Sequence, residues 1–135
     1  MRPFLIAAVV IALLTLMISI ANCSRSETTQ PPAVSSVPAG KDPAAARVLI
    51  AEGAVVIDVR TADEFASGHL ASATNIAVTE ISEHLAEVDK LVAGDKTRPI
   101  VVYCAAGSRA ARAKKVLDAA GYQRVVNGGG YDDLR

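Results

Sequence analysis

The stretch that decides the fold is IVVYCAAGSRAAR, residues 100–112 of a chain of 135 residues. Four apolar residues lead up to Cys104, and Pro99 stands before them, which is the pattern of a short strand buried inside a sheet. Small residues then predict a tight loop, and an alanine-, arginine- and lysine-rich segment of high helix propensity continues to Gly121. We therefore expect Cys104 where a strand passes into the N-terminus of a helix.

This position suits a cysteine that does chemistry. At a helix N-terminus, unpaired backbone N–H groups and the positive end of the helix dipole stabilise a thiolate and attract an anionic substrate. Basic side chains strengthen the field, since four of the seven residues at 109–115 are Arg or Lys. The alternative is a cysteine that only packs in the core, as free cysteines often do. The small residues at 105–108 favour the chemical interpretation, because they let the backbone wrap closely around the sulfur.

Outward from this stretch, short apolar runs alternate with helical patterns. Asp42 and Pro43 fit the start of a helix that stops at Gly53, and Thr61 with Glu64 has the spacing of a capping box. Such an alternation predicts an α/β fold, a small parallel β-sheet flanked by helices on both faces. The sequence predicts helices at 44–52, 61–68, 80–92, 109–120 and 131–134, strands at 54–59, 73–78, 100–103 and 125–126, and a turn at 127–130.

Two charged residues stand at the end of the first predicted strand. Asp58 interrupts an apolar run, so its carboxylate should be paired or hydrogen-bonded, and Arg60 is the nearest candidate in the sequence. In a parallel sheet the ligand site lies beyond the carboxyl ends of the strands, where both Cys104 and residues 58–60 fall. We expect Asp58 and Arg60 to support the site on the same face of the molecule.

Four segments, in the same order and spacing, resemble motifs of the exported, single-domain rhodanese-like (thiosulfate) sulfurtransferases. The loop CAAGSR at 104–109 is similar to the six-residue active-site loop of that family. The other segments are VVIDVR with EF and GHL at 55–60, 64–65 and 68–70, ATNI at 73–76, and GY with NGGG at 121–122 and 127–130. The resemblance covers roughly residues 43–134 and implies a rhodanese-like fold.

The resemblance also implies a reaction. Sulfur would pass from an anionic donor such as thiosulfate to the catalytic Cys104, forming a persulfide, and then to a thiophilic acceptor such as cyanide or a thiol. The backbone N–H groups of the loop residues would hold the persulfide as an oxyanion hole does. The Arg109 side chain would hold the sulfonate end of the donor. The implied substrate-binding residues are Ala105, Ala106, Gly107, Ser108 and Arg109. For His69 the resemblance implies packing and hydrogen bonding rather than general-base action.

Two other functions stay open. Phosphatases and arsenate reductases on the same scaffold carry arginine six positions after the cysteine, where this chain has Ala110. Arg109 falls at five positions, so the loop is sized for sulfur and is too small for a tetrahedral phosphate with its arginine clamp. A non-enzymatic surface module would use the same pocket for binding alone, against which the intact cysteine and the basic loop argue.

Residues 1–23 are predicted to be an export segment outside the fold. Arg2 supplies positive charge, and residues 4–21 are an almost unbroken apolar run of borderline length for a membrane span. Ordinary signal-peptide cleavage, lipidation of Cys23 and an uncleaved anchor all fit this segment. We favour lipidation, because it gives a purpose to an exposed, unpaired cysteine. Each outcome predicts a domain outside the cytoplasm, in the periplasm or another extracytoplasmic location. As a lipoprotein, the protein would also be tethered to the membrane.

Residues 24–40 are rich in Ser, Thr, Pro and Ala, which predicts a flexible linker before a domain at 41–135. The formal net charge of zero argues against nucleic-acid binding and leaves membrane contact to the N-terminus only. The domain holds one thiol, so no internal disulfide is expected, and no cluster has metal-ligand spacing. We expect a monomer without metal or cofactor, whose partners are a small anionic sulfur donor and a thiol or cyanide acceptor.

Overall fold

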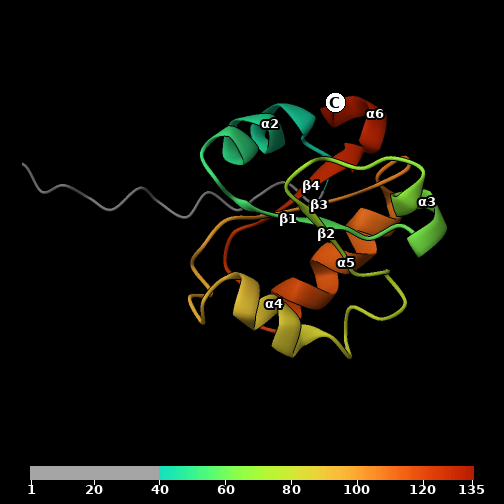
Figure 1. Cartoon of the computed structure of the whole chain (residues 1–135). Coiled ribbons are helices and arrows are strands. Elements are labelled where there is room, and N and C mark those ends of the chain that lie inside the picture. Colours follow the sequence, from blue (N-terminus) through green and yellow to red (C-terminus); the bar gives the residue numbers. More distant parts are fainter. Residues whose placement is uncertain (1–39) are drawn as a thin grey trace, which may run out of the picture. The chain divides into compact units, whose positions relative to one another are not determined.

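The computed structural model describes residues 40–135, and the helices and strands alternate along this part of the chain (Figure 1). The predicted export segment 1–23 with Cys23, and the linker as far as residue 39, lie outside the described residues. The elements are α2 (Pro43–Ala51), β1 (Val55–Asp58), α3 (Ala62–Ala66), β2 (Ala73–Asn75), α4 (Leu85–Leu91), β3 (Ile100–Cys104), α5 (Ser108–Ala119), β4 (Val125–Gly130) and α6 (Tyr131–Leu134).

The four strands form one parallel sheet in the order β2-β1-β3-β4. Strand β1 is followed by the edge strand β2 on one side, whereas β3 is followed by β4 on the other. The chain thus moves outward in opposite directions after the two central strands, and the carboxyl ends of strands at such a switch point are where α/β sheets usually bind their ligands. Asp58 pairs in register with Tyr103, so Asp58 and Cys104 reach this same end of the sheet.

Helices cover both faces of the sheet, which confirms the predicted α/β architecture (Figure 1). All five residues of β3 are buried, and their side chains alternate between two cores. Ile100, Val102 and Cys104 pack in the core beneath α4 and α5. Val101 and Tyr103 pack in the core beneath α2 and α6. Cys104 therefore belongs to the α5 side of the sheet, next to the helix that follows it.

The predicted helix starts are confirmed in their atomic detail. The Asp42 carboxylate accepts a 3.0 Å hydrogen bond from the amide of Ala45, with Pro43 at the first helical position. In α3, the Thr61 hydroxyl oxygen accepts from the amide of Glu64, while the Glu64 carboxylate accepts from the amide of Thr61.

Helix α4 is shorter than the predicted 80–92. It begins at Leu85, and the residues before it form turns in which the amides of Glu83 and His84 both donate to the carbonyl of Glu80. Nδ1 of His84 also lies 3.0 Å from the Glu80 carbonyl oxygen, so the side chain competes with the backbone for this acceptor. Ile81 is still 1% exposed, because the turns place it in the core as a helix would have done.

Strand β2 ends at Asn75, three residues before the predicted end at residue 78. Its partner β1 ends at Asp58, so the ladder has nothing further to pair with. Beyond the strand, the amides of Ile76 and Val78 donate to the carbonyls of Asp58 and Val59. These bonds hold the chain against the sheet without continuing it.

Strand β4 extends to Gly130, so the turn predicted at 127–130 is wrong. Asn and Gly are frequent in turns, but the glycines serve close packing here. A Cβ on Gly128 would lie 2.9 Å from Cδ1 of Leu134. A Cβ on Gly130 would lie 2.5 Å from the carbonyl oxygen of Ala105. The absence of side chains lets β4 run tightly beside the loop that follows Cys104.

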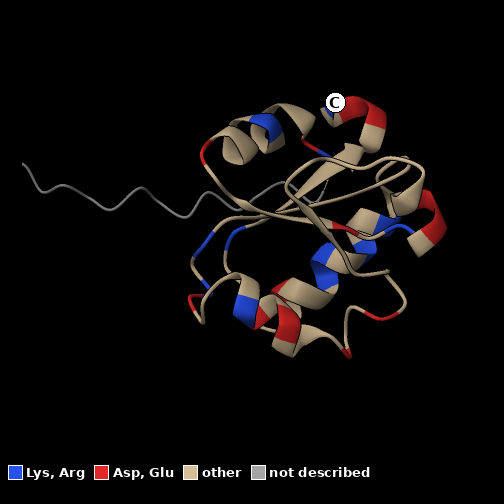
Figure 2. Cartoon of the chain, viewed as in Figure 1, with Lys and Arg blue, Asp and Glu red and all other residues tan. Residues whose placement is uncertain are grey.

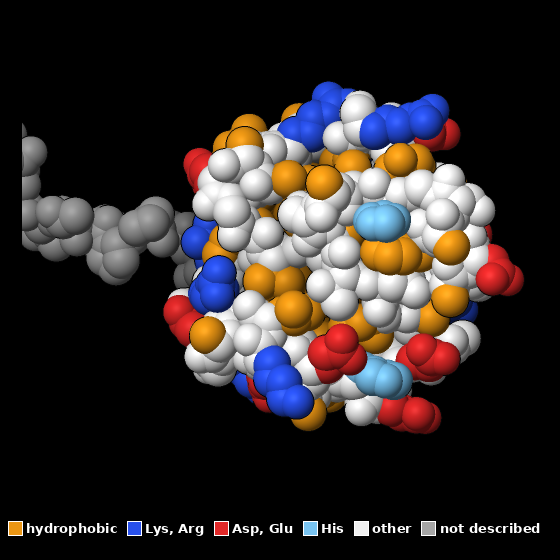
Figure 3. Space-filling view, in the orientation of Figure 1, with side chains coloured by type: hydrophobic (Ala, Val, Ile, Leu, Met, Phe, Trp, Pro, Cys, Tyr) orange, Lys and Arg blue, Asp and Glu red, His pale blue; other side chains and the backbone are white. Residues whose placement is uncertain are grey.

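Hydrophobic side chains are spread over the face seen in Figure 3 in separate small groups, interspersed with polar and charged ones. Among residues 40–135, Val48 is the one large hydrophobic side chain that stands exposed, at 57%. None of the helices in this described part is at once long enough and apolar enough to cross a bilayer.

Candidate active site

Cys104 lies at the end of β3, with α5 starting at Ser108. Gly107, the residue before the helix, has a φ of 101°, a left-handed conformation that glycine adopts without strain. This conformation turns the Gly107 amide back toward the sulfur, and it donates a 3.0 Å hydrogen bond to Sγ of Cys104. The strand and helix thus hold a cysteine sulfur against a backbone donor, as the sequence predicts.

Several backbone amides converge on this sulfur. Burial raises the pKa of the Cys104 thiol, but hydrogen bonds from the amides of Ala110, Ala106, Gly107 and Arg109 lower it, and the net direction is downward. The Ala110 amide was not among the groups expected from the sequence, which ended at Arg109, because Ala110 belongs to the first turn of α5. Helix α5 is 12 residues long, and the amides of Arg109 and Ala110 in its first turn thus act on the sulfur together with the positive end of the helix dipole.

The loop lies between the sulfur and solvent. Ala105, Ala106 and Ser108 are exposed, whereas Gly107 is buried and Cys104 is 1% exposed. Ala105 and Ser108 are two of the residues that the resemblance implies for substrate binding. The two residues lie on the outer side of the loop, where an incoming molecule would meet them first.

Asn127 fixes the loop from the neighbouring strand, a role that sequence reasoning missed. Its Nδ2 donates a 3.0 Å hydrogen bond to the carbonyl of Gly107, and its Oδ1 accepts one from the amide of Gly129. Asn127 is 2% exposed, so both bonds are buried. The NGGG segment could have signalled this contact, had it been interpreted as a strand beside the loop rather than as a turn.

The side chain of Arg109 is already engaged, which the sequence did not predict. Its Nη1 and Nη2 donate to the two carboxylate oxygens of Glu64 at 2.6 and 2.7 Å. The hydrogen bond with Arg109 is the largest cause that lowers the pKa of Glu64 to about 2, and the same bond raises the pKa of Arg109. Both side chains are partly exposed, at 27% for Arg109 and 35% for Glu64. The guanidinium expected to hold a donor therefore carries a bound carboxylate.

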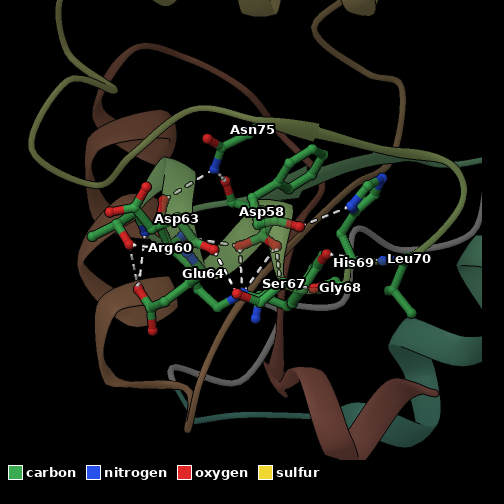
Figure 4. Close-up of polar contacts among 12 residues, drawn as sticks. Asp58, Arg60, Asp63, Glu64, Ser67, Gly68, His69, Leu70 and Asn75 are labelled. Carbon is green, nitrogen blue, oxygen red and sulfur yellow. Dashed lines mark hydrogen bonds and ion pairs between the residues drawn. The ribbon is translucent and has the colours of Figure 1, made fainter.

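Asp58 and Arg60 form the predicted ion pair, with Arg60 Nη2 2.6 Å from Asp58 Oδ2. Arg60 Nε also contacts both carboxylate oxygens at 3.0 Å, and the Arg60 amide donates to Oδ1. Figure 4 shows this network, in which Asn75 donates to the carbonyls of Asp58 and Arg60. The carboxylate hydrogen bond is the main cause that raises the pKa of Arg60.

The pair also fixes the chain that follows α3. Arg60 Nη2 donates to the carbonyl of Gly68 at 2.7 Å, and its guanidinium carbon lies 4.8 Å from the centroid of the Tyr131 ring. Tyr103, next to Cys104, accepts a hydrogen bond from the amide of Leu70. Asp58 and Arg60 thus brace the backbone around the site without contacting the sulfur.

The two histidines lie outside the group around the sulfur. The His69 ring stacks on Phe65 with centroids 3.7 Å apart, and its Nδ1 lies 3.0 Å from the Phe65 carbonyl oxygen. His84 is exposed at the start of α4. Within the described residues 40–135, no three His, Cys, Asp or Glu side chains come together in a way that could hold a metal ion.

The sequence is similar to those of known proteins. The thiosulfate sulfurtransferase PspE of Escherichia coli K12 is 36% identical over 78 residues, covering 58% of this chain and 71% of that protein. Thiosulfate sulfurtransferase 18 of Arabidopsis thaliana is 34% identical over 119 residues, covering 80% and 83%.

Solved structures resemble it as well. An E. coli rhodanese with anions has a TM-score of 0.54 at 34% identity, covering 61% of this chain and 92% of that one. The human single-domain sulfurtransferase TSTD1 also has a TM-score of 0.54, at 29% identity, covering 66% and 88%. Residues 42–134 match the rhodanese-like domain, so the chain belongs to the rhodanese-like sulfurtransferase family.

Proposed function

We propose that the protein is a thiosulfate sulfurtransferase of rhodanese type, in which Cys104 carries the transferred sulfur as a persulfide. The observation that carries this proposal is the 3.0 Å hydrogen bond from the Gly107 amide to Sγ of Cys104, in a loop whose other amides also lower the pKa of the thiol. A thiolate favoured in this way is the nucleophile that sulfur transfer needs.

The first step loads the cysteine. The Cys104 thiolate attacks the outer sulfur of thiosulfate, a new S–S bond forms, and the bond to the SO₃ group breaks with its electron pair leaving on sulfite. The amides of Ala106, Gly107, Arg109 and Ala110, which lower the pKa of the Cys104 thiol, would also stabilise the negative charge that the outer sulfur then carries. In the second step cyanide or a thiolate attacks this outer sulfur and the Cys104 thiolate leaves. No oxidant or reductant is consumed in either step.

The Cys104→Ser variant tests this mechanism. It should lose thiosulfate:cyanide sulfurtransferase activity while keeping the thermal unfolding midpoint of the wild type, because the hydroxyl replaces the thiol at nearly the same size. Cys23→Ser is the matched control, since Cys23 precedes the described domain, and it should keep the activity. Activity that survives in Cys104→Ser would exclude the mechanism.

The same assay separates the two alternatives. A phosphatase or arsenate reductase would turn over an aryl phosphate or arsenate faster than thiosulfate. A binding module would bind a sulfur species without turnover by the wild type. The arginine of the loop stands at position 109, five residues after Cys104, and not at position 110. This loop length supports sulfur transfer over phosphate chemistry.

We further propose that the domain works outside the cytoplasm as a lipoprotein tethered through Cys23. The support is the sequence of residues 1–23, with its charged start and apolar run. Metabolic labelling with a fatty-acid probe should mark the wild type and not Cys23→Ser. Labelling of both proteins, or of neither, would reject lipidation at this residue.

A further inference from the structure

The ion pair between Glu64 and Arg109 places a negative charge on the last residue of the loop proposed to bind an anionic donor. Glu64 lies in the first turn of α3 and Arg109 in the first turn of α5, 45 residues apart in the sequence. Both oxygens of the carboxylate are used, one on each terminal nitrogen of the guanidinium. This fork geometry is the strongest arrangement for the pair, so the guanidinium offers a second anion only its remaining edge.

The carboxylate is also fixed from its own helix. Oε2 of Glu64 accepts hydrogen bonds from the amide of Thr61 at 3.0 Å and from the Thr61 hydroxyl at 3.1 Å. The capping box therefore keeps Glu64 in place even when Arg109 moves. A donor that drew the guanidinium toward itself would therefore have to weaken its hydrogen bonds to this carboxylate.

Arg109 links this carboxylate to the reacting sulfur. Its amide is one of those that lower the pKa of Cys104, and the charge of Cys104 in turn contributes to the raised pKa of the guanidinium. Glu64, Arg109 and the thiolate thus belong to one electrostatic group.

The positive charge around the loop is smaller than the sequence suggests. Of the four basic residues at 109–115, Arg109 is paired with Glu64 and Lys114 with Asp118. In Figure 2 the ribbon of α3, red at its acidic residues, lies beside the N-terminal part of α5, blue at its basic residues, and the Glu64–Arg109 ion pair joins the two helices. The field that remains comes from the helix amides and from exposed Arg112 and Lys115. The Glu64 carboxylate opposes this field, and its repulsion of a doubly charged anion is twice its repulsion of a singly charged one at the same distance.

We infer that Glu64 is a specificity-determining residue, whose charge lowers the reactivity of the doubly charged thiosulfate relative to singly charged sulfur donors such as thiosulfonates and hydropersulfides. The inference rests on the proposed function, since it concerns the donor of that same reaction. With a thiosulfonate, the thiolate attacks the outer sulfur and a sulfinate leaves with the electron pair, so the persulfide formed is identical. The two donors therefore differ in charge and not in product on the enzyme.

Single-turnover loading of the full chain tests the inference. The loading rate of Cys104 is measured against donor concentration for thiosulfate and for benzenethiosulfonate, with no acceptor present, for the wild type and for Glu64→Gln. Glutamine keeps a carbonyl oxygen for the Thr61 amide and removes the charge. The readout is the ratio of second-order rate constants for the two donors, which is independent of the fraction of folded protein.

The ratio of thiosulfate to benzenethiosulfonate should rise about fivefold in Glu64→Gln at low salt, as expected for removing one nearby, partly screened charge. The rise should shrink toward nothing at 1 M salt, where the screening length is about 3 Å. A purely structural effect would not depend on salt in this way. Asp63→Asn is the matched control, because it removes an exposed charge one residue away on the same helix and should leave the ratio unchanged.

The outcomes distinguish failure of the inference about Glu64 from failure of the proposed sulfurtransferase function. An unchanged ratio in Glu64→Gln, or an equal rise in Asp63→Asn, overturns the inference while the sulfurtransferase proposal stands. If neither donor loads the wild type, the proposed function itself fails.

Discussion

Gly130 pairs in register with Cys104 and approaches the next residue, Ala105, so closely that an added Cβ would lie 2.5 Å from the Ala105 carbonyl oxygen. Gly130 has a φ of −92° and a ψ of 159°, which any residue can adopt, so only the contact requires glycine here. The last residue of β4 thus sets how close that strand lies to the loop around the sulfur.

Gly130→Ala should therefore displace the loop. We expect it to lower the free energy of unfolding by about 1–3 kcal/mol, the usual cost of overpacking, and to slow sulfur loading of Cys104. Urea denaturation and single-turnover loading measure the two effects. Gly40→Ala is the control, because a Cβ there meets nothing within 4 Å. A Gly130→Ala protein that matches the wild type in both measurements would refute the close approach.

Removal of the Asp58 carboxylate should destabilise the domain strongly. Asp58 is 0% exposed and Arg60 is 7% exposed, so Asp58→Ala leaves a buried guanidinium without its partner. Breaking a buried pair from one side costs about 3–5 kcal/mol. Urea denaturation of Asp58→Ala, Arg60→Ala and the double variant gives the coupling energy. A double variant whose loss equals the sum of the single losses would show that the two side chains do not stabilise each other.

The Cys104 thiol should ionise at lower pH in the folded protein than in the unfolded one. Burial raises its pKa, but the amides of Ala110, Ala106, Gly107 and Arg109 lower it further than burial raises it. The rate of alkylation by iodoacetamide, followed by mass spectrometry of the peptide that carries Cys104, should rise with pH around a lower midpoint in buffer than in urea. An equal or higher midpoint in buffer would show that the amides do not stabilise the thiolate.

The Glu64–Arg109 ion pair should stabilise the fold at neutral pH and lose this effect in acid. Its carboxyl has a folded-state pKa lowered from 4.5 to about 2, mainly by the hydrogen bond with Arg109. A lowered pKa adds stability that is complete above the unfolded-state value and is lost as the pH falls from about 4.5 to about 2. The difference in thermal midpoint between the wild type and Glu64→Gln should therefore shrink across this interval. A difference that stays constant down to pH 2 would contradict the pairing.

The features that the sequence predicted correctly are those set by neighbours along the chain. Asp42 caps α2, with Pro43 at the first helical position, and Thr61 with Glu64 caps α3. Each of these hydrogen bonds joins residues three positions apart, so the local sequence shows it directly. The Asp58–Arg60 pair, two residues apart, also followed from the rule that a buried charge needs a partner. The parallel sheet followed from the alternation of apolar runs and helical patterns.

The features that the sequence could not predict depend on contacts between distant segments. Glu64 and Arg109 are 45 residues apart, and Asn127 and Gly107 are 20 apart, so no local pattern pairs them. The segment 127–130 was misassigned because its composition is typical of turns, whereas its glycines are required by Leu134 and Ala105 packed against them. The site therefore differs from the prediction chiefly in what surrounds Arg109.

The central claim is that the sulfur of Cys104, held by backbone amides, carries a second sulfur. The most direct test is the mass of the intact protein after incubation with thiosulfate, followed by a second measurement after addition of cyanide. We predict a gain of the mass of one sulfur atom, its removal by cyanide with release of thiocyanate, and no gain in Cys104→Ser. A wild type that gains no sulfur, or a gain that persists in Cys104→Ser, would contradict the account.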